Sequence, residues 1–578
     1  MMKTQNNLLL YTFIACLCFG NESCSTAPQT ENSHTMCNPL PLDYQFTQDD
    51  GVLRRDGAHP CVVLFNERYY LFLSNMKGYY TSDDLLHWQP VSANLPAGGA
   101  PAAVVMNGKI YLTFSDATHT FYCSDSPETG RWETATDGFP YKLAEPSLFY
   151  ENGRLFLYAG SGNKVPLTGM EIDPQTWTPL SPPTPLIHNR KQTHGWEVAG
   201  DYHDWKSLSS WIEGTWMTKR NGMYYLQYAG SGVQYTGSAQ GVYVSRHPLG
   251  PFTLAAHNPF AYKPEGFTKG AGNGCLFQDK FGNDWYLCTT IVSVRHIFER
   301  RLALHPVFFD SDGLLYAATT WGDYPLRIPA RKTASPEELS TGWMLLSYRK
   351  PVKASSEQRK HPACCATDEN IRTWWSATTG DAGEFLSVDL EQPCEVQAIQ
   401  VNFADEGWEE PDSVAGMYQY QLEASDDGRR WQPIGENALR KSHTPHDYMV
   451  LPAPLKKRYF RITNVCMPGG NFSLSGFRLF GKADKLAPGK ATACHGLRNV
   501  SDRRDATFRW RAAEGAVGYV VRYGASPDKL YHSYLVYDDT EITLKGLHAE
   551  WEYYFRVDSF NEGGITRGES VEKVNEAM

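Results

Sequence analysis

Five positions in the first half of the chain begin the same short pattern, and four of them carry polar groups, three of which could do acid–base chemistry. Each is followed by Pro or Gly and then by an apolar run: His59, Ala100, Glu145, Glu213 and Asn273. Two carboxyl groups, an imidazole and an amide brought together would suit glycoside hydrolysis with inversion. That reaction needs a carboxylic acid to protonate the leaving oxygen and a base, about 6.5–9.5 Å away, to activate water.

The pattern recurs five times, which predicts the scaffold that would bring these side chains together. In each copy a turn and an aromatic run follow, and the turns are Asn66-Glu67, Asn107-Gly108, Asn152-Gly153, Asn221-Gly222 and Phe281-Gly282. Asn-Gly between two strand patterns is a strong hairpin signal. A second hairpin follows most copies, as in residues 78–88, 121–132 and 241–252.

Two hairpins per copy make a four-stranded sheet, so residues 40–332 are expected to form a five-bladed β-propeller. The first strand of each propeller blade lines the central channel, so the five positions should converge near one mouth of that channel. The predicted fold class is all-β: a five-bladed β-propeller followed by two β-sandwich domains.

Residues 211–226, Trp-Ile-Glu-Gly-Thr-Trp-Met-x-Lys-x-Asn-Gly-x-Tyr-Tyr-Leu, resemble the acid motif of glycoside hydrolase family 43. Residues 248–252, Pro-Leu-Gly-Pro-Phe, match another run of that family. The resemblance covers residues 40–332 and implies that Glu213 is the general acid. We also expect Asn273, Arg300 and Trp216 to contact the substrate.

Three of the channel positions depart from the family pattern. His59 stands where the family has an Asp base, Glu145 where it has an Asp that tunes the acid, and Asn273 where it has a His. A neutral imidazole can act as a general base, since its ordinary pKa is about 6.5. We therefore expect Glu213, Glu145 and His59 to be the catalytic residues.

Two alternatives stay open from the sequence. The base could be another carboxylate on a loop, and Asp56, Glu197 and Asp201 are candidates by their proximity in sequence. The propeller could instead have lost hydrolysis and bind a glycan only. As a hydrolase it is expected to be inverting and exo-acting on arabinosyl, xylosyl or galactosyl linkages of plant or host glycans.

Two further domains are predicted after the propeller. Residues 343–482 resemble discoidin (coagulation factor type C) domains, a fold that includes family 32 carbohydrate-binding modules, through the runs 368–377, 384–390 and 458–463. Residues 487–578 resemble a fibronectin type III domain through the runs 508–510, 518–523 and 553–557.

No cofactor is expected to be required. The resemblance leaves room for Ca²⁺ on oxygen ligands, in the discoidin-like domain or in the propeller channel. No acidic cluster in the sequence commits the chain to such a site.

The N-terminus predicts export. Lys3 precedes an apolar run, residues 8–19, that is too short to span a bilayer. Cys16 follows Phe13-Ile14-Ala15, which is close to a bacterial lipobox, so lipidation at Cys16 competes with plain cleavage near residue 20 or 23. We expect residues 1–26 to be the export signal of a periplasmic or outer-surface bacterial lipoprotein, or of a secreted protein.

The composition limits the partners that the chain can have. Its net charge is −10 and 20% of its residues are charged, with no basic run that would follow a nucleic-acid backbone. Aromatic residues make up 13% of the chain, which suits both buried strands and sugar-binding surfaces. The expected partner is an oligosaccharide or polysaccharide, with no nucleic acid and with a lipid anchor if Cys16 is modified.

Overall fold

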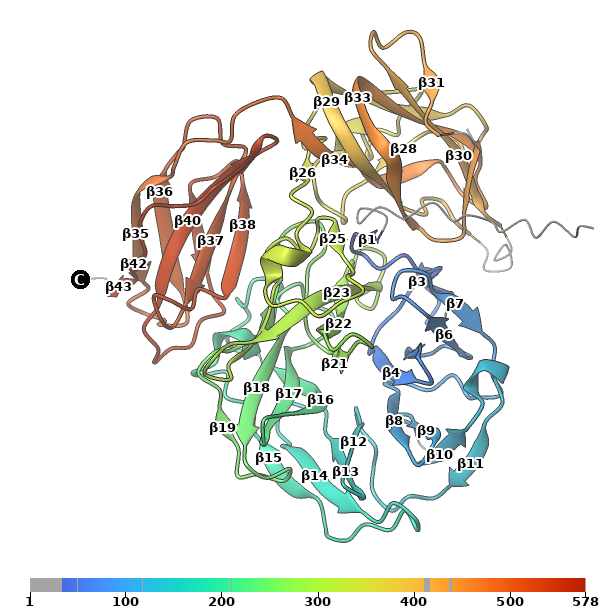
Figure 1. The fold of residues 1–578 in the computed structure, drawn as a ribbon, viewed down its shortest axis with the longest axis vertical. Coiled ribbons are helices and arrows are strands. Elements are labelled where there is room, and N and C mark those ends of the chain that lie inside the picture. The colour runs from blue at the N-terminus through green and yellow to red at the C-terminus, as the bar shows by residue number, and fades with distance from the viewer. Residues whose placement is uncertain are drawn as a thin grey trace, which may run out of the picture.

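The computed structural model describes residues 34–48, 50–116, 118–208, 210–409, 416–435 and 439–576. These residues form strands, loops and short 3₁₀ helices: η2 (Pro127–Thr129), η3 (Gly195–Glu197), η4 (Pro336–Leu339) and η5 (Ala363–Ala366). In this part of the chain no helix is long and apolar enough to cross a membrane. The predicted all-β fold class is confirmed (Figure 1). The predicted export signal, with Cys16, lies outside the described residues.

Five antiparallel sheets follow one another along the chain, four of them with four strands and one with five, and Figure 1 shows them arranged around a centre. The first sheet is β4 (Cys61–Phe65), β5 (Arg68–Phe72), β6 (Tyr79–Ser82) and β7 (Gln89–Val91). The second is β8 (Ala102–Met106), β9 (Lys109–Thr113), β10 (Phe121–Ser124) and β11 (Glu133–Thr136). The third is β12 (Ser147–Glu151), β13 (Arg154–Ala159), β14 (Leu167–Ile172) and β15 (Thr184–Ile187).

The fourth and fifth sheets carry the longest strands of the ring. The fourth is β16 (Trp211–Arg220), β17 (Met223–Ser231), β18 (Ala239–Ser245) and β19 (Thr253–Leu254), and β20 (Ala261–Tyr262) also pairs with β18. The fifth is β21 (Cys275–Gln278), β22 (Asp284–Ile291), β23 (Arg300–Phe309) and β24 (Leu315–Ala317). Two small ribbons complete this part of the chain: β1 (Thr35–Met36) with β25 (Leu326–Arg327), and β2 (Phe46–Thr47) with β3 (Arg54–Arg55).

The first strands of the five sheets contact one another in a closed ring. β8 contacts β4 and β12, β16 contacts β12 and β21, and β21 returns to β4. Each neighbouring pair of sheets encloses its own hydrophobic cluster, such as Tyr79 with Trp132 between the first and second sheets, and Leu71 with Trp285 between the fifth and first. The other three clusters join the remaining neighbours. The sheets are therefore the blades of a propeller whose core is divided among its blade interfaces.

The blade hairpins follow from their turn residues. Four Asn residues have left-handed φ angles: Asn66 (49°), Asn107 (51°), Asn152 (50°) and Asn221 (49°). Two-residue hairpins of type I′ need positive φ at both central positions, which Asn and Gly tolerate best. The fifth turn differs from the prediction, because β21 ends at Gln278 and β22 begins at Asp284, which leaves a longer loop around Gly282.

A second domain follows the propeller. Its strands form one connected sheet: β26 (Met344–Leu345), β27 (Val352–Ala354), β28 (Trp375–Ser376), β29 (Phe385–Phe403), β30 (Tyr418–Ser425), β31 (Gln432–Pro433), β32 (Leu439–Ser442), β33 (His446–Cys466) and β34 (Ser473–Ala483). Two of these strands are long, since β29 and β33 span 19 and 21 residues. Their pairing shifts register at two places, and such irregularities let a strand bend around a core.

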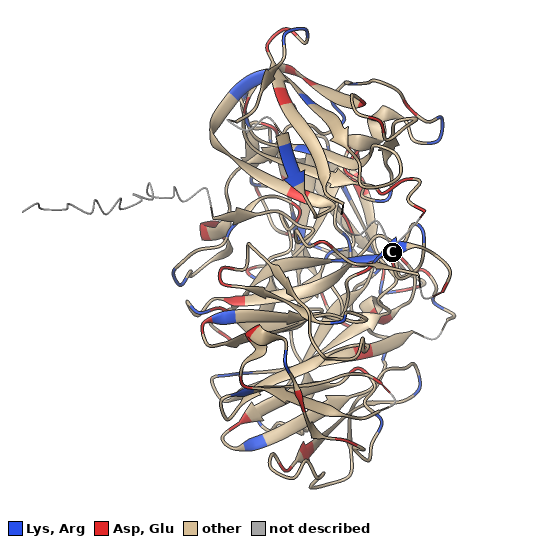
Figure 2. Cartoon of the chain, turned by 90° about the vertical axis from the view of Figure 1, so that its right-hand side faces the viewer, with Lys and Arg blue, Asp and Glu red and all other residues tan. Residues whose placement is uncertain are grey.

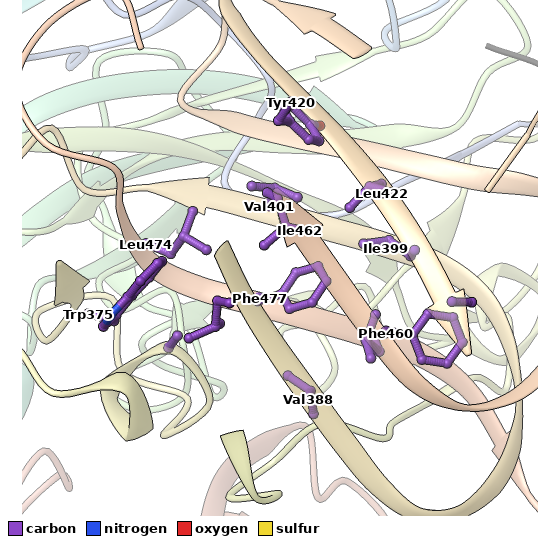
Figure 3. Packing of buried hydrophobic residues seen from close by; sticks show 14 of the residues in the cluster. Trp375, Val388, Ile399, Val401, Tyr420, Leu422, Phe460, Ile462, Leu474 and Phe477 are labelled. Atoms are coloured by element: carbon purple, nitrogen blue, oxygen red, sulfur yellow. The ribbon is translucent and has the colours of Figure 1, made fainter. Parts of the chain in front are cut away.

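Figure 3 shows the core of this second domain. Trp375, Val401, Phe460 and Phe477 lie among the strands and are almost completely buried. The side chains come from β28, β29, β33 and β34, so segments about a hundred residues apart depend on one another. The domain is a β-sandwich, as predicted.

The third domain has two sheets around one core. The first sheet is β39 (Glu541–Leu544), β36 (Ala506–Arg511), β35 (Thr492–Arg498) and β43 (Asn575–Glu576). The second is β38 (His532–Tyr537), β37 (Gly518–Gly524), β40 (Tyr554–Asn561) and β41 (Gly564–Thr566), with β42 (Glu572–Lys573) beside β40. Phe508, Val521 and Phe555 pack between them. This domain is the second sandwich, and its fibronectin type III identity stays a prediction.

Charge is spread over all three domains. Figure 2 shows segments of Lys and Arg interspersed with segments of Asp and Glu in that view. The expectation that the protein has no nucleic-acid partner stays a prediction.

Replacing the buried indole of the second domain should destabilise it strongly. We expect Trp375→Ala to lower the free energy of unfolding by about 3–5 kcal/mol, because it removes a large buried ring and leaves a cavity. The urea midpoint of the domain's transition measures this effect. The control is Leu439→Ala in β32, where the side chain is 38% exposed, and a shift equal to that of Trp375→Ala would contradict the assignment of the core.

Candidate active site

The blade-start positions converge because of how each blade begins. Four of the five have left-handed backbone angles: His59 (52°), Ala100 (34°), Glu145 (47°) and Asn273 (49°). Such angles cost of order 1–3 kcal/mol in residues other than Gly and persist only where the surrounding structure holds them. Glu213 differs, since it lies within β16 and the positive φ of 61° falls on Gly214.

Glu145 lies between two of the other groups. Asn273 donates its Nδ2–H to Glu145 Oε2 at 3.3 Å, and His59 Nε2 lies 3.7 Å from Glu145 Oε1. Burial raises the pKa of Glu145 to about 7, although the Asn273 hydrogen bond and the Arg300 charge act in the opposite direction. The structure thus brings Asn273 to the carboxyl group rather than leaving it at a blade turn.

His59 is held by the neighbouring turns of the first and second blades. Its Nδ1 lies 2.7 Å from Ser74 Oγ, and that oxygen also accepts the Ala100 N–H at 2.8 Å. The His59 N–H donates to Thr289 Oγ1 at 3.2 Å. Burial, followed by the Arg300 charge, lowers the pKa of His59 to about 4. The ring is therefore neutral at neutral pH, the form that a general base requires.

Glu213 carries the second carboxyl group of the site. Ser161 donates its hydroxyl to Glu213 Oε2 at 2.7 Å. Burial and then the Glu145 charge raise the pKa of Glu213 to about 7, while the Ser161 hydrogen bond lowers it. Since two neighbouring carboxyl groups resist being charged together, Glu213 retains its proton when Glu145 is ionised. This is the state that a general acid needs.

A buried ion pair stands beside these groups. Arg300 Nε and Nη2 donate to the two carboxylate oxygens of Asp56 at 2.9 and 2.7 Å. The Arg300 charge lowers the pKa of His59, Glu145 and Glu213, so the pair belongs to the site. Contact between Arg300 and substrate stays a prediction. Asp56, one of the alternative bases, is engaged by the guanidinium.

The other two alternative bases have structural partners. Glu197 is fully buried and accepts the hydroxyl of Tyr228 at 2.5 Å, and its Oε1 lies 2.8 Å from His194 Nδ1. Asp201 forms an ion pair with Arg372 of the second domain at 2.7 Å. These partners argue against either carboxylate as the base.

Trp216 packs among the blades of the propeller. Its indole N–H donates to the Leu276 carbonyl at 2.8 Å, and its ring packs against three of the inter-blade clusters. Contact between Trp216 and substrate stays a prediction, and the ring fills space between blades. The reason is its place three residues after Glu213 on β16, beyond the irregularity in pairing between those two residues.

Sequence reasoning missed three residues of the site. Ser74 and Ser161 hold His59 and Glu213, and no local signal links them, because they lie 15 and 52 positions away in sequence. Trp211 is 43% exposed and lies two residues before Glu213, on the same side of β16. Its ring lies over Gly162, next to Val165. The acid motif contained this Trp, but the motif alone did not show that its ring is exposed.

The described residues contain no group of three or more His, Cys, Asp or Glu side chains that could hold a metal ion.

Comparison with known families agrees with this geometry. Residues 49–315 match glycosyl hydrolases family 43, and residues 351–475 match the F5/8 type C domain. The first match falls on the propeller and the second on the domain that follows it. A search of curated proteins found no match.

Several solved structures resemble the chain at low identity. A Bacteroides ovatus protein, Xyloglucan PUL GH43B, is 16% identical, with 92% of this chain and 97% of that chain covered and a TM-score of 0.41. An endo-1,4-beta-xylanase from Bacteroides thetaiotaomicron is 22% identical over 45% of this chain and 94% of its own, with a TM-score of 0.38. An arabinoxylan arabinofuranohydrolase from Bacillus subtilis is 14% identical over 78% and 99%, with a TM-score of 0.36.

The raised pKa of Glu213 predicts how stability depends on pH. Its folded pKa of about 7 exceeds the ordinary value of 4.5, so the folded state binds this proton more tightly and the contribution of Glu213 to stability falls as pH rises between these values. Glu213→Gln removes this dependence. The variant should match wild type below pH 4.5 and be more stable above pH 7, as measured by urea midpoints.

The control for that measurement is Glu133→Gln, where the side chain is exposed on β11. This variant should follow the wild-type pH dependence. If Glu213→Gln does so too, the carboxyl group is not buried as the structure has it.

Proposed function

We propose that the family 43 domain hydrolyses glycosidic bonds with inversion, with Glu213 as the general acid and His59 as the general base. The observation that carries the proposal is that one site holds an acid and a base whose pKa values differ. A carboxyl group with a pKa of about 7 faces the same site as an imidazole with a pKa of about 4. Between these values the acid holds a proton and the base can accept one.

The reaction follows from these roles. Glu213 donates its proton to the glycosidic oxygen as the bond from that oxygen to the anomeric carbon breaks. A water on the opposite face of the sugar forms the new bond and transfers a proton to His59. Burial keeps Glu213 protonated until the bond breaks, and ionisation of the neighbouring Glu145 further raises the pKa of Glu213, which makes Glu145 the tuning group. Asn273, bound to Glu145, holds that carboxylate in place.

The proposed substrates are arabinosyl, xylosyl or galactosyl linkages at chain ends. Trp211 supports an oligosaccharide as the leaving group, because its exposed ring lies next to the acid on the same strand. Two residues along a strand span about 6.6 Å, which is close to the length of one sugar ring. Aromatic rings present an apolar face to such ligands.

A glycan-binding propeller without turnover is the second candidate. One observation favours it: both ring nitrogens of His59 already have neighbours, Ser74 Oγ at Nδ1 and the Glu145 carboxyl group at Nε2. A water would have to enter between His59 and Glu145 to be activated. Kinetics on leaving groups of different chemistry separate the two candidates.

We further propose that the protein is exported and acts at a bacterial surface or in the periplasm, with lipidation at Cys16 as its anchor. The apolar run and the near-lipobox of the sequence support this. Labelling with a palmitate analogue in wild type and Cys16→Ala tests it.

Turnover should depend on the two proposed groups in different ways. On arabinosides, xylosides or galactosides, Glu213→Gln and His59→Gln should each lower kcat by about 10²–10⁴-fold, since each removes proton transfer. On a glycosyl fluoride, whose leaving group needs no proton, only His59→Gln should be slow. Turnover that survives His59→Gln would assign the base to another group, and binding without turnover of any substrate would favour the second candidate.

The pH dependence of kcat/KM should be bell-shaped. Activity should rise as His59 loses its proton around pH 4 and fall as Glu213 loses its proton around pH 7. A profile that keeps rising through pH 8 would contradict Glu213 as the acid.

Trp211→Ala should weaken oligosaccharide binding about tenfold, because it removes one stacked ring. Isothermal titration with Glu213→Gln as background measures this without turnover. KM for a glycosyl fluoride, which has no leaving-group sugar, should not change. The control is Phe281→Ala, an aromatic side chain 40% exposed in the turn between β21 and β22, and equal effects of the two variants would remove the proposed role of Trp211.

A further inference from the structure

The F5/8 type C domain docks on the propeller through a buried ion pair. Arg55 Nε donates to Asp405 Oδ2 at 2.9 Å, and Arg55 Nη2 donates to the Tyr418 hydroxyl at 3.1 Å. All three side chains are nearly completely buried. The Tyr418 hydroxyl in turn donates to Asp405. Asp405 and Tyr418 belong to the second domain, so the propeller's guanidinium is neutralised from outside the propeller.

A second buried contact lies beside the first. Arg301 Nε donates to His446 Nε2 at 3.0 Å, and His446 Nδ1 lies 2.8 Å from Asn402 Oδ1. His446 therefore accepts at one nitrogen and donates at the other, which is the neutral form of the ring. Arg301 Nη1 also donates to the Arg55 carbonyl at 2.9 Å. Arg301 is thus also hydrogen-bonded to the backbone of Arg55.

These two Arg residues are chain neighbours of the ion pair at the active site. Asp56 follows Arg55, and Arg300 precedes Arg301. The side chains of Arg55 and Arg301 contact the second domain. The side chains of Asp56 and Arg300 pair with each other at the active site. The Gly57 N–H donates to the Arg300 carbonyl at 3.2 Å, so the two backbone segments are also joined directly.

We propose that the F5/8 type C domain is a structural part of the propeller's active site, in which Asp405 and His446 hold Arg55 and Arg301 and thereby position the Asp56–Arg300 pair. Asp405, Tyr418 and His446 are positioning residues, because they act through the propeller's arginines. Their effect on the position of the Asp56–Arg300 pair concerns the fold alone, whereas their effect on catalysis rests on the proposed hydrolase function.

The physical reason lies in what a buried guanidinium requires. Without Asp405, Arg55 would remain as a buried charge that has lost its carboxylate, an unstable state that is relieved only when the side chain and its backbone move. Asp56 shares that backbone. A displacement of about 1 Å at a catalytic group can lower the rate about 100-fold. The Arg300 charge also acts on the pKa of His59, Glu145 and Glu213, so moving it alters the whole site.

The test compares ion pairs across one interface. In the full-length protein, Asp405→Ala removes the partner of Arg55, and Tyr418→Phe removes one hydrogen bond with little change in shape. The matched control is Arg372→Ala, which breaks the Asp201–Arg372 pair between the same two domains. Hydrogen–deuterium exchange of residues 54–58 and 298–302 is measured for each variant, together with kcat and KM.

We expect Asp405→Ala to raise exchange in both segments and to lower kcat at least tenfold, with Tyr418→Phe showing a smaller effect in the same direction. Arg372→Ala should change neither. Exchange that is unchanged in Asp405→Ala, or equal to that in Arg372→Ala, overturns the proposal.

The two proposals fail in different ways. If exchange rises in both segments but kcat does not fall in an active enzyme, the catalytic part of the inference is wrong. If wild type has no turnover, the hydrolase proposal fails, and the exchange data still decide whether the second domain positions Asp56 and Arg300.

Discussion

A buried positive charge, that of Arg300, acts on the three titratable groups of the site. Because a guanidinium so deeply buried needs a carboxylate, Asp56 is held against it. The same charge makes His59 less basic and opposes the effect of burial on Glu145 and Glu213. Without it, the imidazole would hold a proton more readily and both carboxyl groups would be harder to ionise. Burial is the largest influence on the pKa of all three groups, and one ion pair modifies all three of these pKa values.

The propeller supplies the burial that this chemistry needs. Each blade packs one face against the blade before it and the other face against the blade after it. The hydrophobic core of the ring is therefore divided into five separate clusters. Trp216 contacts three of these clusters close to Glu213 on the same strand, and so fills the interior on one side of the acid. Excluding water from that side raises the pKa of the carboxyl groups, since the charged form is no longer hydrated.

Much of the fold and part of the site could be predicted from the sequence. The repeated hairpins are indicated by their own turn residues, and the acid motif around Glu213 is contiguous, so both could be predicted from the sequence. The partners that tune the site were not, because Asp56 and Arg300 are 244 residues apart and Asp405 is 350 residues from Arg55. The packing of Trp216 among the blades was not predictable either, because residue type and spacing do not show which way a strand turns at an irregularity in its pairing. The long strands β29 and β33 were also missed, since a bend looks like a strand boundary in sequence.

The small ribbon of β1 and β25 constrains the order in which the chain can fold. Asn38, just after β1, donates its side-chain N–H to the Leu304 and Gly322 carbonyls at 3.0 and 2.9 Å and accepts the Leu304 N–H at 2.9 Å. Gln400 of the second domain donates to the Asn38 carbonyl. Asn38 is thus synthesised long before its partners, which lie some 266 to 362 positions later in the chain. Contacts between residues so far apart in sequence form slowly. During synthesis the ring stays open with its first and last blades apart, and the exposed apolar faces of these two blades are where association between chains would begin.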